Sequence, residues 1–427
     1  MRIRMLVFLA AAVPAALGQA PAAGLAKCGG LRVRRSAHDL SPDEWQRIGR
    51  VVAQLHSNGH FDRFARAHNV LFDSVHGTAA FFPFHRRFVQ EFEDLGRQID
   101  PEFTVPYWDS TRDSRDPASS SVLQDDTLGG NGQGPGRCLR NGIQGQWGSL
   151  VPRRHCLRRD FNDGDAILPW VPAEVISSFL QTDRRLADFS EHIEYSIHGA
   201  VHIGLGGDAG TRVAPNDLFF YMHHANIDRL WWQWQVGHRR VFDYNGPGPN
   251  GEAVLDDVIP QTGDVSFGGA QVRSVMVLGY GTVCYAYDSA PPPPASYPRR
   301  RPPGPQPGRG RSSQAPAAPV LSGGSNATSA GLEAARIHGA LSGDPALKKY
   351  FPGIAALAGP DRSIGAYDDG SALSCAERRA RRLVHPAPVP EAWIRMHNFD
   401  PARVRRVYDE MYRLIDQLNN STYVSPY

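Results

Sequence analysis

Two groups of histidines constrain this chain more than any other feature. The first group is His68, His76 and His85, and the second is His198, His202 and one member of the pair His223–His224. Three neutral imidazoles are a typical ligand set for copper or zinc. Both groups lie among aromatic residues that recur at helical intervals, so the pattern predicts a helical scaffold that holds two metal ions side by side.

The second group has helical spacing. His198 and His202 are four residues apart, which is about 40° of rotation on an α-helix, so both rings can reach one ion from one face. The three residues between them include no glutamate, which excludes the HExxH zinc-protease motif. Neighbouring helical residues point about 100° apart. One of His223 and His224 can therefore face the metal, and the spacing does not decide which.

The first group needs a break between two helices. His76 and His85 are nine residues apart, which would place them on opposite sides of a single helix. Pro83 resolves this because proline favours the first turn of a helix. We expect His76 on the preceding loop, His85 on the first turn and His68 near the end of an earlier helix. Each histidine taken singly is more typical of packing or of a surface; the two complete groups favour metal binding.

The helical periodicity predicts four helices around these residues. The first follows Ser41, which with Pro42 and Glu44 forms an N-cap, a first-turn proline and a capping box. The second follows Pro83, the third covers residues 191–202, and the fourth runs from about 218 to 234. Residues 110–165 are rich in Gly, Asp, Ser and Arg and are expected to be mostly loop.

The composition divides the chain into four parts. Residues 1–20 resemble a secretory signal peptide, with early arginines and a short apolar run. Residues 28–288 look globular and form the expected catalytic domain. Residues 289–330 are rich in Pro, Arg and Gly and predict an extended linker. Residues 331–427 form a small helical extension, which ends in an amphipathic helix that begins at Asp400 and Pro401.

The cysteine content fits an oxidising compartment, and we expect a secreted protein. The five cysteines are Cys28, Cys138, Cys156, Cys284 and Cys375. Cys138 and Cys156 bracket a glycine-rich segment and are the preferred pair, and the odd count leaves at least one thiol outside an internal bond. Glycosylation sequons, which such a compartment could use, stand at Asn326, Asn419 and Asn420.

The overall charge and hydropathy limit the possible partners. The formal net charge is +3, which indicates no general polyanion partner such as nucleic acid. After the first segment, no apolar stretch reaches the roughly 18 residues that a transmembrane helix needs. The sequence does not indicate an oligomeric state.

Several motifs resemble the tyrosinase and catechol oxidase family of paired-copper proteins. They are ARAHN (65–69), VHGTAAFFPFHRRFVQEFE (75–93), VPYWD (105–109), IEYSIHGAVH (193–202) and APNDLFFYMHHANIDRLW (214–231). CYAYD (284–288) is similar to the segment that closes the family's central domain. The resemblance covers roughly residues 28–288, and the eight-residue step from His68 to His76 is similar to the compact fungal and invertebrate members.

The resemblance implies a mainly α fold, a four-helix bundle that holds two copper ions. It assigns one copper to His68, His76 and His85. It assigns the other to His198, His202 and His224, since the family's ligand is the second histidine of the pair. Three positions depart from the family pattern without removing a ligand: Ser74 excludes a cysteine–histidine crosslink, Leu218 replaces a proline, and Phe84 replaces a tryptophan.

The resemblance also implies a reaction. Such a site uses O2 to oxidise o-diphenols, a class of small phenolic substrate, to o-quinones. Hydroxylation of monophenols needs help to deprotonate the phenol, and Glu194 is the candidate catalytic residue for that step. Gly199 stands where the family can carry an asparagine and offers no side-chain acceptor. We therefore expect strong diphenol oxidation and weak or no monophenol hydroxylation.

Two further expectations and three alternatives remain at this level. Asn69, Arg86 and Asp228 are candidates to orient the ligand rings, and ordinary helix-surface ion pairs explain them almost as well. The C-terminal extension is expected to cover the site until the linker is cut. The alternatives are a haemocyanin-like O2-binding protein, a secreted non-catalytic relative, and a zinc hydrolase, which would leave one histidine group unexplained.

Overall fold

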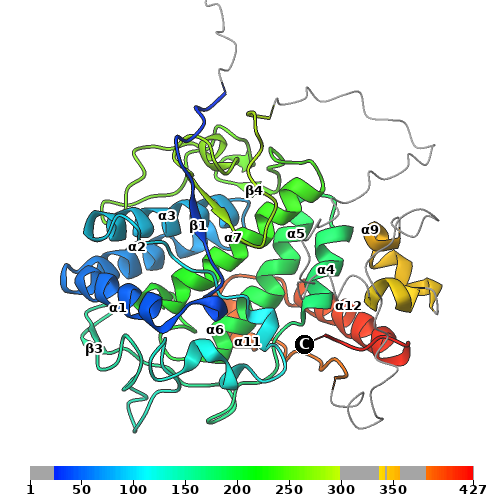
Figure 1. Ribbon diagram of the computed structural model, residues 1–427, viewed down its shortest axis with the longest axis horizontal. Coiled ribbons are helices and arrows are strands. Elements are labelled where there is room, and N and C mark those ends of the chain that lie inside the picture. Colours follow the sequence, from blue (N-terminus) through cyan, green and yellow to red (C-terminus); the bar gives the residue numbers. More distant parts are fainter. Residues whose placement is uncertain (1–23, 299–335, 342–343, 356–380, 427) are drawn as a thin grey trace, which may run out of the picture.

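The computed structural model describes residues 24–298, 336–341, 344–355 and 381–426. Helices dominate these ranges, and every strand is two or three residues long, which confirms the expected mainly α fold (Figure 1). None of the helices in the described ranges is long and apolar enough to cross a membrane. The expected signal peptide, most of the 289–330 linker, the sequon at Asn326 and Cys375 lie outside the described residues.

The core consists of seven helices and one π-helical turn. The helices are α1 (Pro42–Ser57), α2 (His60–Val75), α3 (Phe81–Ile99), α4 (Ala173–Thr182), α5 (Leu186–Ile193), α6 (Gly199–Leu205) and α7 (Phe219–Gly237). The π-helical turn Glu194–His198 joins α5 to α6. The C-terminal part contributes α9 (Pro352–Ala355), α11 (Glu391–Met396) and α12 (Pro401–Asn420).

The remaining elements are short. Strand β1 (Arg32–Arg34) pairs in parallel with β6 (Tyr285–Tyr287). Strands β2 (Gly148–Ser149) and β3 (His155–Cys156) pair antiparallel, as do β4 (Pro247–Gly248) and β5 (Gly251–Glu252). Turns of 3-10 helix cover Ala37–Asp39, Ser110–Asp113, Pro117–Ser119, Ser121–Leu123, Ala214–Asn216, Val272–Val275 and Pro345–Lys349. Residues 110–165 are thus mostly loop, as predicted.

Local sequence signals set several helix ends. The Ser41 hydroxyl accepts a hydrogen bond from the Glu44 backbone N–H, and the Glu44 carboxylate accepts one from the Ser41 N–H, so the predicted capping box is present. Helix α3 begins at Phe81, two residues before the predicted start. Pro83 still lies in the first turn. The N–H groups of the first turn have no partner within a helix, so proline, which lacks an N–H, costs no hydrogen bond there.

The third predicted helix differs most from expectation. Instead of one continuous helix over residues 191–202, the chain forms α5, the π-helical turn and α6. A π-turn inserts one extra residue into a helix, and such turns are frequent at functional sites. His198 is the last residue of this turn, and His202 lies in α6. The insertion therefore changes the direction of the helix just where the second histidine group begins.

Helices α2, α3 and α7 and the α5–α6 segment form the bundle that carries the histidine groups, whereas the four helices predicted from periodicity included the helix after Ser41, α1, in place of α2. Helix α3 packs along α7, and α1 packs against both α2 and α3. Helix α7 is buried on nearly every side, from Phe219 to Trp234. A helix that is buried around its whole circumference lies in the centre of a domain, as α7 does (Figure 1).

A buried ion pair connects the central helices. Arg86 of α3 donates from Nε to Oδ1 of Asp228 of α7 at 2.5 Å, and both side chains are inaccessible to solvent or nearly so. The hydroxyls of Tyr285 and Tyr287 donate to the other carboxylate oxygen at 2.7 and 2.6 Å. The guanidinium of Arg86 also stacks on the Trp231 ring at 3.7 Å. This network ties α3 and α7 to β6.

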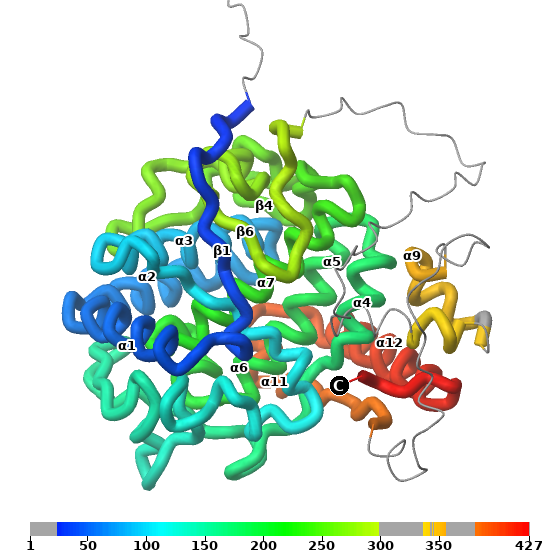
Figure 2. The backbone as a smooth tube through the Cα atoms, in the orientation of Figure 1, coloured from blue at the N-terminus to red at the C-terminus, as the bar shows by residue number. Residues whose placement is uncertain are grey.

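The N-terminal strand β1 pairs with β6, the last strand of the core domain. Figure 2 shows β1 beside β6, which agrees with their parallel register. A disulfide between Cys28 and Cys284 fastens the same two segments, with 5.6 Å between their Cα atoms. The predicted disulfide between Cys138 and Cys156 is confirmed and joins the long loop to β3.

The C-terminal extension docks on the core. Asp400 caps α12, and the predicted apolar stripe of that helix is buried: Val404, Val407, Tyr408, Met411, Leu414, Ile415 and Leu418. Helix α12 contacts α4, α11 and the π-helical turn, so the stripe packs on the catalytic domain as expected (Figure 2). At the chain's end, the Tyr423 hydroxyl donates to the buried Glu174 carboxylate at 2.5 Å.

We predict that Arg86→Met lowers the free energy of unfolding by about 3 kcal/mol, because it removes the nearer cation of the buried Asp228 carboxylate and leaves only Arg34, at 3.8 Å. Urea denaturation of the metal-free protein measures this. Arg395→Met removes the same chemical group from an exposed pair with Glu391 and should change stability by no more than about 0.5 kcal/mol. Equal losses in the two variants would contradict the role assigned to Arg86.

Candidate metal centre

The first histidine group converges on one point. His68 lies in the middle of α2, His76 directly follows α2, and His85 lies in the first turns of α3. Their ligand atoms lie within 4.8 Å of one another, and all three side chains are buried. The connection between the helices needs Gly77, whose φ of +66° is rarely adopted by other residues. The predicted break between His76 and His85 is confirmed.

Backbone carbonyls orient these rings. Nδ1 of His76 donates to the Phe72 carbonyl at 3.0 Å, and Nδ1 of His85 donates to the Phe81 carbonyl at 2.7 Å. Each partner is four residues earlier in the chain. Nδ1 of His68 donates to the Arg212 carbonyl at 2.8 Å. A ring whose Nδ1 carries the proton presents the lone pair of Nε2, which is the usual arrangement of a metal-ligating histidine.

The second group forms an equivalent cluster. The ligand atoms of His198, His202 and His223 lie within 4.8 Å of one another, and the three residues are buried. Nδ1 of His202 donates to the Ala209 carbonyl at 2.6 Å. The loop that supplies this carbonyl also supplies the Arg212 carbonyl to His68. One loop therefore orients a ring in each group.

The third member of the second group has two candidates. His224, the residue predicted from the resemblance, lies 5.2 Å from His198 and 5.8 Å from His202 between ring centroids. His223 lies 5.7 and 5.2 Å from the same rings. The two differ in what else they meet: the His224 ring stacks on His85 of the first group at 4.0 Å. In both rings, neither nitrogen has a hydrogen-bond partner.

The two groups lie next to each other. The His76 and His198 rings are 5.7 Å apart between centroids, which is close to the spacing inside the first group, where His68 and His85 are also 5.7 Å apart. Metal ions in paired sites are typically about 3.5–4 Å apart. The arrangement is compatible with two ions that share one pocket, and it places His224 at the junction of the groups.

The chemistry of these imidazoles fits metal ions. Burial, and then the Arg212 cation, lower the pKa of His68 to about 4, and burial lowers the pKa of His202 to about 3. Burial, and then the neighbouring imidazoles, lower the pKa values of His76, His85 and His198 well below the usual value. All the rings are therefore neutral at physiological pH. Nε2 of His68, His85 and His202 is buried without a hydrogen-bond partner. Unpaired buried polar atoms are costly, and a soft dication would satisfy them.

Aromatic residues surround the cluster. Phe81 contacts rings of both groups, at 4.9 Å from His85 and 5.0 Å from His198. Phe84 lies 5.0 Å from His85, whereas Phe82 stacks on Phe189 and Trp231, away from the predicted ligands.

Two further phenylalanines of this aromatic shell each contact a histidine one helical turn later. Phe220 lies 4.3 Å from His224, and Phe72 lies 4.2 Å from His76. Each stands four residues before the histidine that it touches. Helical spacing could have identified both.

Glu194 lies in the π-helical turn beside the first group. Its carboxylate accepts hydrogen bonds from the Gly77 N–H at 2.8 Å and from the Ser190 hydroxyl at 3.1 Å. Burial raises its pKa to about 8. The carboxylate thus links the segment that carries His198 to the residue that follows His76.

The three residues expected to orient the rings have other positions. Asn69 is exposed on α2. Arg86 and Asp228 are buried, but their described bonds join the helices to each other and to β6 rather than to a ligand ring. Their contribution to the site is to hold α3 and α7, which carry His85 and the His223–His224 pair.

The C-terminal extension covers the histidines. The Trp393 ring lies 5.4 Å from His202 and 5.9 Å from His198. The His397 ring lies 5.0 Å from His76 and 6.1 Å from His198. Figure 2 shows α11 next to α6. No local pattern in the sequence indicated these two side chains, because Trp393 is 191 residues from His202 and His397 is 321 residues from His76.

Gly199 makes room for this cover. A methyl group at this position would lie 2.7 Å from Val389 Cγ1 and 2.9 Å from Trp393 Nε1. The glycine that the sequence reading related to the reaction therefore also has a packing role.

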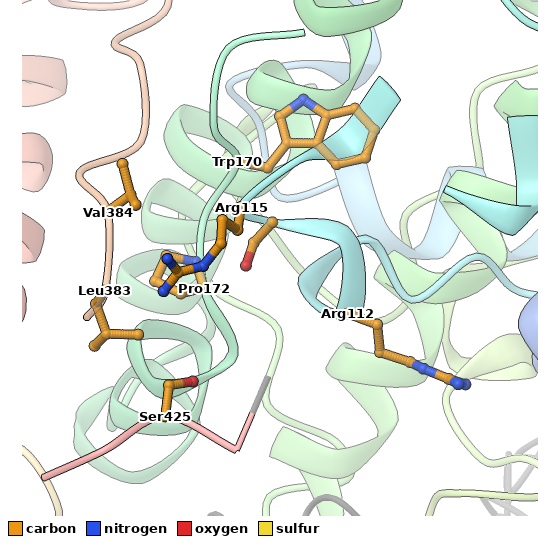
Figure 3. A pocket seen from close by; sticks show the side chains of 8 residues that line it. Arg112, Arg115, Trp170, Pro172, Leu383, Val384 and Ser425 are labelled. Atoms are coloured by element: carbon orange, nitrogen blue, oxygen red, sulfur yellow. The ribbon is translucent and has the colours of Figure 1, made fainter. Parts of the chain in front are cut away.

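The hollow in Figure 3 lies elsewhere. It is formed at the seam between the core and the extension, by Arg112, Ser114, Arg115, Trp170, Pro172, Leu383, Val384 and Ser425. None of the predicted ligands lines it. The six predicted ligands are at most 4% exposed, with aromatic side chains and the extension packed against them.

Comparison with known proteins agrees with this geometry. The common central domain of tyrosinase matches residues 58–237, a range that includes every predicted ligand. Tyrosinase ustQ of Aspergillus flavus is 33% identical over 294 residues, which cover 61% of this chain and 80% of that protein. The tyrosinase of Streptomyces antibioticus is 33% identical over 233 residues, which cover 49% of this chain and 84% of that protein.

The chain belongs to the tyrosinase family. It is therefore a tyrosinase-type copper oxidoreductase, and the resemblance drawn from its motifs is confirmed. A solved polyphenol oxidase from Thermothelomyces thermophila has the same fold, with a TM-score of 0.52 at 23% identity over 60% of this chain and 88% of that one. The family implies a dicopper centre, and the two histidine groups fit one.

We predict that His224→Phe reduces the copper content from about two ions per chain to about one, because His224 faces both groups and phenylalanine keeps the ring but removes its donor atoms. His223→Phe, the matched control, should keep about two ions. Elemental analysis of the purified, copper-loaded variants measures this. Loss of an ion in His223→Phe alone would assign the ligand to His223 instead.

We also predict that Gly199→Ala lowers stability by about 1–3 kcal/mol, because the added methyl group overpacks the seam with Val389 and Trp393. Gly237→Ala is the control: it is also helical, but nothing lies within 4 Å of its added methyl group. Alanine is the better helix former by up to about 1 kcal/mol, so the control should be neutral or more stable. Urea denaturation distinguishes the two, and a Gly199→Ala variant as stable as the control would exclude the proposed contact.

Proposed function

We propose that this tyrosinase-family protein uses O2 to oxidise o-diphenols to o-quinones at a pair of copper ions. The observation that supports this most directly is the convergence of two sets of buried, neutral imidazoles. Nε2 is without a protein partner in four of the proposed ligands, His68, His85, His202 and His224. The proposed ligands are His68, His76 and His85 for one ion and His198, His202 and His224 for the other.

The reaction balances without a further reductant. Each o-diphenol loses two electrons and two protons, and two such oxidations convert one O2 to two waters. When bound, the two copper ions would supply the redox couple that links diphenol to O2. A zinc hydrolase is the weaker alternative, because it would need one histidine group only.

The chain's own residues exclude water and position the phenol. Phe81 and Phe220 line the junction of the two groups, and each contacts rings of both. Such an apolar shell controls solvent access and the polarity around a metal site. The same rings offer a flat, apolar surface to a phenol.

Glu194 is the proposed proton acceptor. It is buried next to the first group, and its pKa of about 8 reflects an environment that favours the neutral carboxyl. At neutral pH this carboxyl is mainly protonated, and its deprotonated form, a stronger base than an ordinary carboxylate, can accept a phenol proton on one of its oxygens. Gly199 supplies no side chain to assist it, which supports a preference for diphenols over monophenols.

The extension makes the full chain a latent form. Trp393 and His397 occupy the space beside the histidines that a phenol would need. We propose that cutting near residues 299–311, within the linker predicted from composition, allows this cover to leave. The disulfides and the predicted signal peptide support secretion. The secreted protein would be inactive until the linker is cut.

The same cover favours one second candidate. A protein that binds O2 without turning over substrate needs a pocket closed to phenols, and here the extension closes it. The two functions are distinguished by the cut protein: the oxidase gains activity when the cover leaves, whereas an O2-binding protein does not.

We predict that the copper-loaded chain, cut at a protease site engineered within residues 299–311, oxidises catechol much faster than the uncut chain. It should also act much faster on catechol than on tyrosine. O2 consumption and quinone absorbance measure both rates. Equal rates before and after complete cutting would contradict latency, and comparable turnover of tyrosine and catechol would contradict the proposed preference.

A ligand variant gives the control for this experiment. His85→Phe should lower catechol oxidation of the cut protein by at least about 100-fold. Removing only the hydrogen-bond partner of a metal ligand costs up to about 100-fold, and this variant removes the ligand itself. Reversible O2 binding by the cut wild-type chain without quinone formation would favour the O2-binding candidate.

A further inference from the structure

His397 has the hydrogen-bonding pattern of a metal ligand. Its Nδ1 donates to the carbonyl of Trp393, four residues earlier, at 3.0 Å. His76 and His85 each donate in the same way to a carbonyl four residues earlier, at 3.0 and 2.7 Å. In all three rings the proton is therefore placed on Nδ1, and Nε2 presents its lone pair.

The Nε2 atom of His397 has no partner. The side chain is 3% exposed, and Nε2 is buried without a hydrogen bond, as are the Nε2 atoms of His68, His85 and His202. A buried imidazole nitrogen that served only for packing would be expected to find a donor, since nearly all buried polar atoms do. The unpaired lone pair points to a ligand.

The ring packs against the first group, although His397 is outside the set of ligand atoms that all lie within 4.8 Å of one another. Its centroid is 5.0 Å from that of His76, compared with 5.1 Å between His76 and His85 and 5.2 Å between His76 and His68. It is farther from the second group, at 6.1 Å from His198. His397 therefore extends the first group rather than the second.

The surrounding contacts hold this position. The His397 ring packs on Trp393 at 3.9 Å, on Phe72 at 4.7 Å and on Phe399 at 4.9 Å. Arg212, whose carbonyl orients His68, donates from its side chain to the Met396 carbonyl at 3.1 Å. The residue that sets a ring of the first group is thus bonded to the segment that carries His397.

We propose that His397 is a seventh ligand of the dicopper centre and binds, through Nε2, the ion held by His68, His76 and His85. The C-terminal segment is then fastened over the centre by a coordinate bond as well as by packing. This inference rests on the proposed dicopper function. It adds a metal-dependent attachment to the extension, so that copper binding strengthens the cover.

The test compares leucine and methionine at position 397 in the full, uncut chain. The two side chains are similar in size, but the methionine thioether is a soft ligand that suits Cu(I), whereas leucine has no donor atom. The protein is loaded with two Cu(I) ions, and their transfer to a coloured chelator is followed over time. His397→Leu should release one of the two ions about 10-fold faster or more than wild type. His397→Met should restore slow release.

Trp393→Phe controls for packing. It perturbs the same segment and retains the imidazole of His397, so its release of copper should stay close to wild type. A merely structural role for His397 would give the same rates for the leucine and methionine variants, or would make the Trp393 variant as fast as the leucine variant. Either result would overturn the proposal.

The outcome also separates this proposal from the dicopper function. If wild type binds two ions and all variants release them at the wild-type rate, the dicopper site stands and His397 is not a ligand. If wild type binds no pair of ions, the proposed function fails, and the inference fails with it.

Discussion

The structure depends on burying a group of imidazoles in their neutral form, close together, with many of their nitrogens unpaired. Burial lowers the pKa of each ring, and the neighbouring rings lower it further in most of them, so none can become charged without strong repulsion. Carbonyl groups satisfy Nδ1 in four of the six predicted ligands. Several other nitrogens have no protein partner, a state that bound metal ions would relieve: Nε2 of His68, His85 and His202, Nδ1 of His198 and both nitrogens of His224.

This requirement explains much of the architecture. The rings can converge only if α2, α3, the π-helical turn and α7 keep fixed positions. The buried Arg86–Asp228 pair and the parallel pairing of β1 with β6 fasten α3, α7 and the end of the domain. The loop before α7 supplies carbonyls to His68 and His202. The extension then shields the cluster from solvent, with Trp393 and His397 against the rings.

Local patterns carried most of the prediction from sequence. The capping box at Ser41, the break at Pro83 and the apolar stripe of α12 each depend on residues close in the chain, and each is present. The second histidine group could be found from its helical spacing, and the first from the helix break that Pro83 indicates. The π-helical turn could not be predicted from the sequence, because one inserted residue leaves the 3.6-residue pattern of a helix almost unchanged over five positions.

Long-range contacts were the other limit. Helical geometry shows that His223 and His224 point in different directions, but not which one faces a partner on α3. The positions of Arg86 and Asp228 between helices, rather than beside the ligand rings, also depend on tertiary packing. His397 gave no signal, since an isolated histidine far from both groups becomes meaningful only when the extension is seen against His76.

The central claim is that these imidazoles hold two copper ions side by side. A crystal of the copper-loaded chain, measured on both sides of the copper absorption edge, tests it directly by anomalous scattering. The account predicts two anomalous peaks in one pocket, one beside the Nε2 atoms of His68, His76 and His85 and the other beside His198, His202 and one of the paired histidines of α7. A single peak, or peaks away from these rings at full copper loading, would contradict it.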